Sequence, residues 1–307
     1  MSHKRSELPD HLLNLSLPNC RVLNWQPLEG GATNLSIRLQ LEGSNDTFVL
    51  RRYLRDPAVC QKEVALLRLL CGQLPVPEVV YADPSGKQAG EPFLLYRYVH
   101  GLTFRQLRAH GSSEDTAQAA HALGTSLATL QRVSASASAA RLGLSSRPAP
   151  TEACFTDSLL EGRLGSDNAN LLRKLFVIWS PRLCQLQLEN SIVHGDFNRR
   201  NVVFNRTNGI WRVAGILDWE LACTGSSLWD AARFLCYETD TSPCCEPHFS
   251  NGFRENGGSL PEDWLTFSRV INTISAAEGL LRPDLQVQFL PELIQLVHLG
   301  IHGEQLA

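Results

Sequence analysis

One polar run between apolar segments constrains the fold of this chain more than any other feature. The run extends from His194 to Asn201, and the apolar residues 191–193 lead into it. Residues 201–204 and 213–217 are apolar and strand-like, and the turn-forming residues 205–209 join them. This pattern predicts a β-hairpin. A hairpin would bring Asn201 and Asp218 close together at its open end.

The residue types in this region suit transfer of a phosphate group from ATP to a hydroxyl. That reaction needs a carboxylate to accept the proton of the attacking hydroxyl, and oxygen ligands that hold Mg²⁺ against the phosphates. We assign the first role to Asp196 and the second to Asn201 and Asp218. Each residue alone would more often belong to a polar turn or cap a strand. The joint pattern, in this chain order, argues against coincidence.

The run resembles the aminoglycoside phosphotransferase family and its choline-kinase-like relatives. That family has His-Gly-Asp, four residues and then Asn, as in His194 to Asn201 here, and a second motif matched by Ile216 to Glu220. The resemblance implies an α+β, bilobal protein-kinase-like fold, with a small antiparallel-sheet N-lobe and a larger, mainly helical C-lobe. We predict an N-terminal nucleotide-binding lobe over residues 1–98. A C-terminal catalytic and acceptor-binding lobe would then occupy residues 99–307.

Hydrophobic periodicity along the chain agrees with this layout. Residues 21–52 read as three antiparallel strands, because apolar residues alternate along them and turn-forming residues separate them. A helix is predicted to about residue 71 after Pro57, and strands at 78–81 and 92–99. The remaining predicted elements are helices, at 114–133, 156–164, 168–189, 228–237, 262–280 and 285–299.

The first turn of the predicted sheet is a candidate cover for nucleotide phosphates. It contains Gly30 and Gly31, and glycine lets backbone amides approach anionic oxygens. Most Gly-Gly pairs are plain turns. This pair lies where the resembled family has its nucleotide loop, and Asn34 follows it as an Asn commonly does there.

Kinase folds carry a cation on the third strand, held by a glutamate of the next helix, to bind phosphates. Here that strand offers Arg51 and Arg52. Val49 and Arg51 share one face, and Val-Leu-Arg resembles the family sequence, so we choose Arg51 with Glu63 as its partner. Arginine in place of the usual lysine keeps the charge but alters the geometry. A surface Arg–Glu pair is the alternative.

Three further assignments follow from the resemblance. Residues 93–101 resemble the hinge whose backbone binds adenine, which assigns that contact to the backbone from Arg97 to Val99. Arg200, or its neighbour Arg199, would stabilise charge on the moving phosphoryl group or support the loop. Asp230 would anchor the C-terminal lobe near the catalytic loop.

Composition limits the other classes of function. The 307 residues carry a net charge of -3 and a pI near 6.3, which gives no nucleic-acid footprint. The sequence contains no membrane-length apolar stretch and no signal-peptide pattern at its start, so we expect a cytoplasmic protein. Nine scattered cysteines form no Cys-x-x-Cys pair, which argues against a zinc ribbon. The oligomeric state is left open.

The resulting hypothesis is a Mg²⁺-dependent kinase that uses ATP, or GTP, to phosphorylate a hydroxyl of a small molecule. The expected acceptor is aminoglycoside-like, an amino alcohol or a sugar. Acidic residues in the later segments would favour an amine-bearing acceptor; those available are Glu152, Asp157, Glu161, Glu238, Asp240, Glu246, Glu262 and Asp263. The alternative is a pseudokinase that senses nucleotide or binds other proteins.

Overall fold

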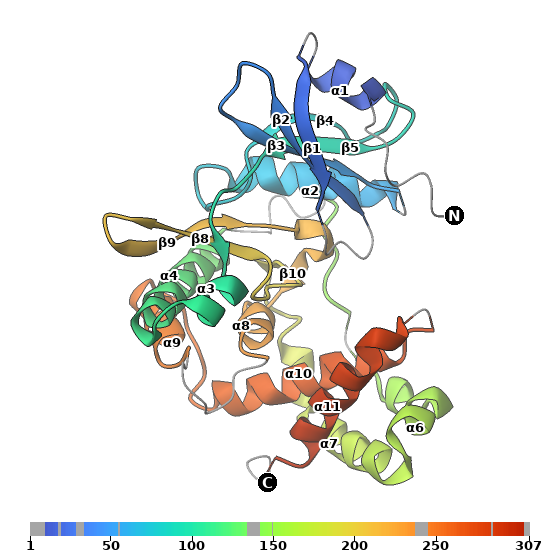
Figure 1. Ribbon diagram of the computed structural model, residues 1–307. Helices are drawn as coiled ribbons and strands as arrows, with labels where there is room; N and C mark the ends of the chain where they lie inside the picture. Colours follow the sequence, from blue (N-terminus) through green and yellow to red (C-terminus); the bar gives the residue numbers. More distant parts are fainter. Residues whose placement is uncertain are drawn as a thin grey trace.

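A five-stranded antiparallel sheet and a mainly helical region make up the molecule (Figure 1). The computed structural model describes residues 10–17, 20–28, 34–54, 56–133, 142–148, 150–236, 245–283 and 285–303. The sheet and its helices lie at one end of the molecule, and the helical region lies at the other. This arrangement confirms the predicted α+β, bilobal kinase-like fold. The lobe boundary between residues 98 and 99 stays a prediction.

The sheet has the strand order β1-β2-β3-β5-β4. Its strands are β1 (Val22–Pro27), β2 (Leu35–Leu41), β3 (Thr47–Arg52), β4 (Val79–Asp83) and β5 (Phe93–Arg97). Adjacent side chains of a strand face opposite sides, so Leu95 packs in a small core beneath helix α1 (Asp10–Ser16), whereas Leu94 joins the main core. The three strands predicted within residues 21–52 are therefore confirmed.

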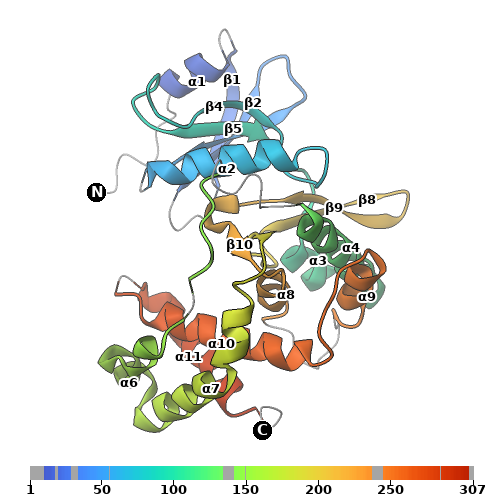
Figure 2. The same cartoon turned by 180° about the vertical axis from the view of Figure 1, so that it is seen from behind.

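Helix α2 (Pro57–Leu70) covers the other face of the sheet (Figure 2). Asp56 caps its N-terminus by accepting a hydrogen bond from the Ala58 amide, and Pro57 occupies the first turn, where it costs no hydrogen bond. The buried residues of this helix include Val64, Leu67 and the charged Glu63. A buried glutamate needs partners, and it finds them in the candidate site.

The predicted hairpin is confirmed as β8 (Val202–Thr207) and β9 (Ile210–Ile216). Its turn is shorter than residues 205–209, because Asn208 and Gly209 both take left-handed conformations, with φ of 52° and 81°. Two such residues close a tight hairpin turn, which lets both strands extend further. Strand β6 (Leu102–Thr103) adds to β8, and β7 (Ser191–Val193) pairs with β10 (Cys223–Gly225).

The helical region differs from the prediction mainly at helix boundaries. The helix predicted at 156–164 begins at Ser158, because Asp157 accepts a hydrogen bond from the Leu159 amide and caps it. The one predicted at 168–189 begins two residues earlier and ends four residues earlier. Helices of this region are α3 (Phe104–His110), α4 (Ser113–Arg132), α6 (Ser158–Leu164), α7 (Ser166–Gln185), α8 (Leu228–Phe234), α9 (His248–Glu255), α10 (Trp264–Leu280) and α11 (Leu290–Ile301), with 3-10 turns η1 (Glu152–Thr156), η2 (Trp219–Leu221) and η3 (Val287–Phe289).

Helix α9 was not predicted, and it packs closely on α4 (Figure 2). Glycines make this approach possible: a Cβ on Gly124 would lie 2.0 Å from the Phe249 carbonyl oxygen, and one on Gly252 would lie 2.1 Å from that of His121. In the part of the chain that the structure describes, no helix is long and apolar enough to cross a membrane.

Candidate active site

Asp196 occupies the loop between β7 and β8, where side chains from two directions hold it. The Asn201 Nδ2 group donates to the Asp196 carbonyl oxygen at 3.0 Å and to Oδ2 at 3.1 Å. Arg233 of α8 donates from Nε to Asp196 Oδ1 at 3.2 Å. The carboxylate therefore has a fixed orientation. The sequence pattern paired Asp196 with Asn201 but gave no sign of Arg233.

Asp230 anchors the start of this loop, the role that the family resemblance implies for it. Its carboxylate is buried and accepts hydrogen bonds from the amides of His194 at 2.7 Å and Gly195 at 3.0 Å. Burial raises the pKa of Asp230 to about 6, and His194 and the two amides oppose that rise. The His194 ring bridges to the Leu217 carbonyl oxygen at 2.9 Å, which ties the loop to the end of β9.

Asn201 and Asp218 meet at the open end of the hairpin. Val202 pairs with Ile216, and the Leu217 amide donates to the Asn201 carbonyl oxygen at 2.8 Å. Asp218 itself takes a left-handed conformation with φ 68°. Such backbone conformations in residues other than glycine are concentrated at functional sites.

This end of the hairpin has a donor set that fits Mg²⁺. Because Asn201 donates through Nδ2 to Asp196, its oxygen Oδ1 is the atom left for a cation. Asp218 adds a carboxylate that is about one-third exposed. Mg²⁺ prefers such oxygen ligands and usually completes its shell with water and phosphates. Among the described residues no group of three or more His, Cys, Asp or Glu side chains could hold a metal.

Arg51 lies among three carboxylates. Its Nη2 donates to Asp218 Oδ1 and to Glu220 Oε2, each at 2.7 Å, and Nη1 lies 3.6 Å from Glu63 Oε1. Burial alone would lower the pKa of the Arg51 guanidinium, but Glu63 and Asp218 raise it well above its usual value. Arg52 lies on the opposite face of β3 and pairs with Glu91 at 2.8 Å. The predicted neighbourhood of Arg51 and Glu63 is therefore present, and both side chains are buried rather than at the surface.

Glu63 connects α2 to the segment that follows Asp218. It accepts from the Tyr53 hydroxyl at 2.6 Å and from the Trp219 amide at 3.2 Å. Burial and the neighbouring Glu63 raise the pKa of Tyr53 well above its usual value, which keeps the phenol protonated as a donor. Glu63 therefore positions both the cation on β3 and the backbone that follows Asp218.

Glu220 extends the site toward the first turn of the sheet. Asn34 donates from Nδ2 to Glu220 Oε2 at 2.6 Å. Burial, and then the nearby Asp218, raise the pKa of Glu220. The sequence analysis assigned no role to Glu220, although it is the last residue of the motif from Ile216 to Glu220. Gly30 and Gly31 lie outside the described residues.

The hinge backbone is partly engaged by the protein itself. The Arg97 amide donates to the Glu78 carbonyl oxygen at 3.0 Å, and the Tyr98 amide donates to that of Thr47 at 2.8 Å. Val99 packs against Gly215, where a Cβ would lie 2.8 Å from a Val99 methyl group. An adenine contact at this hinge would thus use carbonyl oxygens and the Val99 amide, rather than the Arg97 amide.

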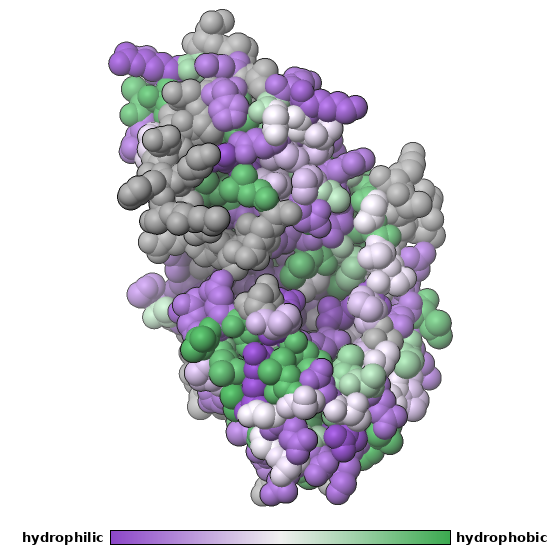
Figure 3. Space-filling model, turned by 90° about the vertical axis from the view of Figure 1, so that its right-hand side faces the viewer, coloured by the Kyte–Doolittle hydropathy of each residue, from purple (hydrophilic) through white to green (hydrophobic). Residues whose placement is uncertain are grey.

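A cavity of about 670 Å³ opens beside Asp196. Most of its lining comes from the β7–β8 loop and from helices α8, α10 and α11. Arg200 lies in that loop and lines the cavity. The Arg200 side chain is exposed, and its amide donates to Asn198 Oδ1 at 2.8 Å. Figure 3 shows the right-hand side of Figure 1, the side on which α6 and α11 lie.

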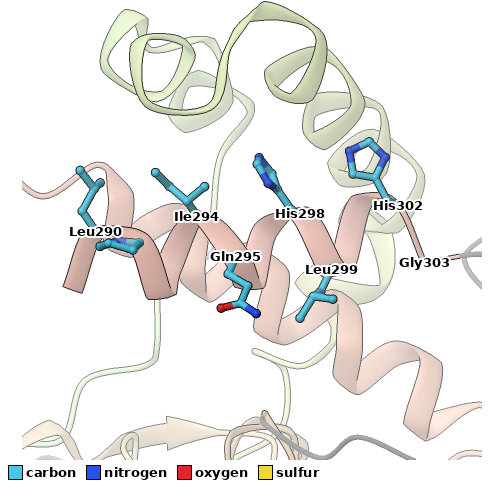
Figure 4. A pocket seen from close by; sticks show the side chains of 8 residues that line it. Leu290, Ile294, Gln295, His298, Leu299, His302 and Gly303 are labelled. Carbon is cyan, nitrogen blue, oxygen red and sulfur yellow. The ribbon is translucent and has the colours of Figure 1, made fainter. Parts of the chain in front are cut away.

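Helix α11 separates this cavity from a second hollow. Phe289, just before the helix, and Glu292, Leu293 and Leu296 within it line the catalytic cavity. Leu290, Ile294, His298 and His302 follow one another along another side of the helix (Figure 4). That second hollow has no Asp, Glu, Arg or Lys in its lining, so it does not share the chemistry of the first.

Comparison with known proteins agrees with this geometry. Residues 24–261 match the model of a family described as the phosphotransferase enzyme family (APH). The chain belongs to this family. Membership confirms the predicted family and the prediction of a phosphotransferase.

Solved structures share the fold across the whole chain. The GDP and kanamycin complex of APH(2")-IIia is 19% identical, with a TM-score of 0.70 over 95% of this chain and 97% of that one. The streptomycin–ATP–APH(2")-IIa complex is 17% identical, with a TM-score of 0.64 over 98% and 99%. Macrolide 2'-phosphotransferase MphH of Brachybacterium faecium is 18% identical, with a TM-score of 0.65 over 96% and 98%.

A shorter match links this chain to a plant protein. The Arabidopsis thaliana protein named Probable acyl-CoA dehydrogenase IBR3 is 32% identical over 100 residues. The match covers 33% of this chain and 12% of that protein. This chain therefore relates to a small part of a much longer polypeptide.

Proposed function

We propose that this protein transfers the γ-phosphoryl group of ATP, or of GTP, to the hydroxyl of a small molecule. The observation that carries this proposal is the Asp196 carboxylate, which lines a cavity and is oriented by Asn201 and Arg233. A carboxylate in that setting can bind an acceptor hydroxyl and take its proton. Family membership supports the same reaction class.

In the proposed reaction the acceptor oxygen forms a bond to the γ-phosphorus. The bond from that phosphorus to the bridging oxygen breaks, and its electron pair leaves with ADP. Asp196 accepts the proton of the hydroxyl. Mg²⁺, when bound, neutralises charge on the phosphates, and Asn201 and Asp218 are the residues that would hold it.

The remaining predicted residues fit supporting roles on the nucleotide side. Arg51 is the cation for the α- and β-phosphates, and Glu63 keeps it in position. Gly30, Gly31 and Asn34 would cover the phosphates, and the backbone of Arg97 and Val99 would contact adenine. Arg200 would stabilise charge on the moving phosphoryl group.

The test is a coupled ADP-release assay with Mg²⁺ and ATP or GTP, on wild type and Asp196→Asn. Asp196→Asn should lose acceptor-stimulated turnover by at least roughly 10²-fold, the lower range for a general base, while melting at an unchanged temperature. Asp263→Asn is the matched control, since that carboxylate pairs with Arg182 at the surface. Appreciable turnover in Asp196→Asn would remove Asp196 from the role of base. Nucleotide binding without any turnover in wild type would favour the pseudokinase alternative.

A further inference from the structure

The lining of the catalytic cavity is strongly basic. Six arginines line it: Arg105, Arg147, Arg199, Arg200, Arg233 and Arg282. The acidic residues in the same lining are three, Asp196, Glu278 and Glu292. Six positive and three negative charges leave a net charge of +3, although the whole chain carries -3. The positive charge is therefore concentrated where an acceptor would bind.

Part of this charge is held in place by aromatic and polar contacts. The Arg147 guanidinium lies 4.0 Å from the centre of the Trp229 ring and 3.5 Å from both Ser275 Oγ and Glu278 Oε2. Such a stacked guanidinium loses little entropy when it binds an anion, because its plane is already fixed. Burial raises the pKa of Glu278, despite the opposing effect of Arg147.

Two other arginines add positive charge without forming an ion pair to a described carboxylate, and a third lies beside Glu278. Arg105 and Arg200 are exposed, and neither forms an ion pair with a carboxylate in the described ranges. Arg282 is also exposed, one turn beyond Glu278. Guanidinium groups bind carboxylate and phosphate oxygens through paired hydrogen bonds.

The other walls of the cavity are apolar. Helix α8 supplies Trp229 and Phe234, and α10 supplies Ile271. Leu285, Phe289, Leu293 and Leu296 extend the apolar lining across the segment leading into α11 and the helix itself. A ligand that fits this cavity has an apolar part as well as a charge.

The acidic residues that would favour an amine-bearing acceptor lie elsewhere. Of those predicted from the sequence, the members in the described ranges are absent from the cavity lining. Asp157 caps α6, Glu246 accepts from Ser250, and Asp263 pairs with Arg182. Their positions remove the sequence-based reason to expect a cationic acceptor.

We propose that the acceptor is an anion: a hydroxyl compound with an apolar body and a carboxylate or phosphate group. This inference rests on the proposed phosphotransferase function and names the substrate class of the same site. The arginines bind the anionic group, the apolar walls hold the body, and the hydroxyl faces Asp196. During transfer the acceptor hydroxyl becomes a phosphate ester, its proton goes to Asp196, and ADP leaves with the electron pair of the broken bond.

The test compares acceptors that differ only in the group at one end. Hydroxyhexanoate, hydroxyhexyl phosphate and aminohexanol each carry a terminal hydroxyl on a six-carbon chain, and kanamycin serves as a polycation. ADP release and binding by calorimetry are measured for each. We expect the carboxylate or the phosphate to bind and to stimulate ADP release, and the two anions distinguish which group the arginines prefer. Preference for aminohexanol or kanamycin, or failure of both anions to bind, would overturn the inference.

A variant of the cavity provides an independent test. Arg282→Gln should raise the KM for the preferred anion about tenfold, with a much smaller change in kcat, because the residue binds the charged group and not the reacting atoms. Arg254→Gln, on α9 and outside the cavity, is the matched control and should change neither constant. Equal KM values in the two variants would contradict the role of Arg282. Amine-only acceptors that still require Asp196 would overturn the anionic class while leaving the phosphotransferase in place.

Discussion

Arg51 and Arg52 permit a sharp test, because adjacent residues of one strand have opposite roles. Arg51 is 7% exposed and is the cation among Glu63, Asp218 and Glu220. Arg52 pairs with Glu91 on the other face, away from this cluster. Arg51→Met keeps an unbranched, flexible side chain but removes the guanidinium and its charge, and Arg52→Met makes the same chemical change at the neighbouring position.

The stability effect follows from what each substitution leaves behind. Removing one partner of a buried ion pair costs about 3–5 kcal/mol, since the remaining charge is buried without compensation. Arg51→Met leaves Glu63, which is 2% exposed, with only the Tyr53 hydroxyl and the Trp219 amide as donors. We expect Arg51→Met to lower the free energy of unfolding by about 3–5 kcal/mol. The Arg52 pair is more exposed, so its loss should cost less than about 2 kcal/mol.

The effect on nucleotide binding separates the two residues further. A hydrogen bond to a charged group contributes about 1.5–3 kcal/mol, which corresponds to roughly a 10- to 150-fold change in Kd. Arg51→Met should weaken ATP binding by at least that factor, because three carboxylates would then face the phosphates without a cation. Arg52→Met should keep the wild-type Kd. Urea denaturation and calorimetric titration with Mg²⁺·ATP measure the two effects.

Two results would refute this reasoning. If Arg51→Met bound ATP as tightly as wild type, Arg51 would not be the phosphate cation. If Arg52→Met destabilised the protein as much as Arg51→Met, burial among the carboxylates would not be the source of the cost. Arg51→Lys then tests the choice of arginine: one ammonium replaces a guanidinium that reaches three carboxylates, so intermediate stability is expected.

Two further predictions concern the catalytic loop. Gly195→Ala should reduce stability by more than about 1–3 kcal/mol, the usual cost of a left-handed residue, because Gly195 has φ 83° and its added Cβ would lie 2.3 Å from the Leu221 carbonyl oxygen. Gly165→Ala is the control, since Gly165 has φ 80° but open space around its Cβ position, so it measures the conformational cost alone. Equal melting temperatures of the two variants would contradict the clash at Gly195. Asp230→Asn should flatten the pH dependence of stability. The folded pKa of about 6 exceeds the ordinary aspartate pKa of 3.8, so stability falls by about 3 kcal/mol as pH rises through that window. Urea denaturation from pH 4 to 7 that shows the same slope in wild type and Asp230→Asn would refute this assignment.

Local features of this fold could be predicted from the sequence because local physics determines them. The alternation in β2 and β3, the helix that begins at Pro57 and the apolar strands around Asn201 can be recognised from neighbouring residues alone. The hairpin then brings Asn201 to Asp218 through the pairing of its own strands. The turn at residues 205–209 was predicted too long, because the five turn-forming residues do not reveal that only Asn208 and Gly209 take positive φ.

Contacts between distant segments could not be predicted in the same way. Arg233 reaches Asp196 across 37 residues, and Arg51 reaches Glu220 across 169. Helix and strand periods relate residues only a few positions apart, so they cannot predict either pair. Helix α9 was missed because its buried face depends on α4, against which Gly252 packs.

The residues proposed for phosphoryl transfer and much of the cavity wall belong to different elements. The hairpin and the β7–β8 loop carry Asp196, Asn201 and Asp218, whereas α10 and α11 carry much of the cavity wall. On α10 the wall residues Asn272, Ser275, Ala276 and Gly279 follow helical spacing, so they form one face that can change without altering the hairpin. Of the six arginines that line the cavity, Arg147 and Arg282 lie outside the β7–β8 loop and do not contact Asp196, whereas Arg233 donates to it. Under the proposed function, a chain with this hairpin would keep the phosphotransferase chemistry while residues outside the hairpin select an anionic acceptor.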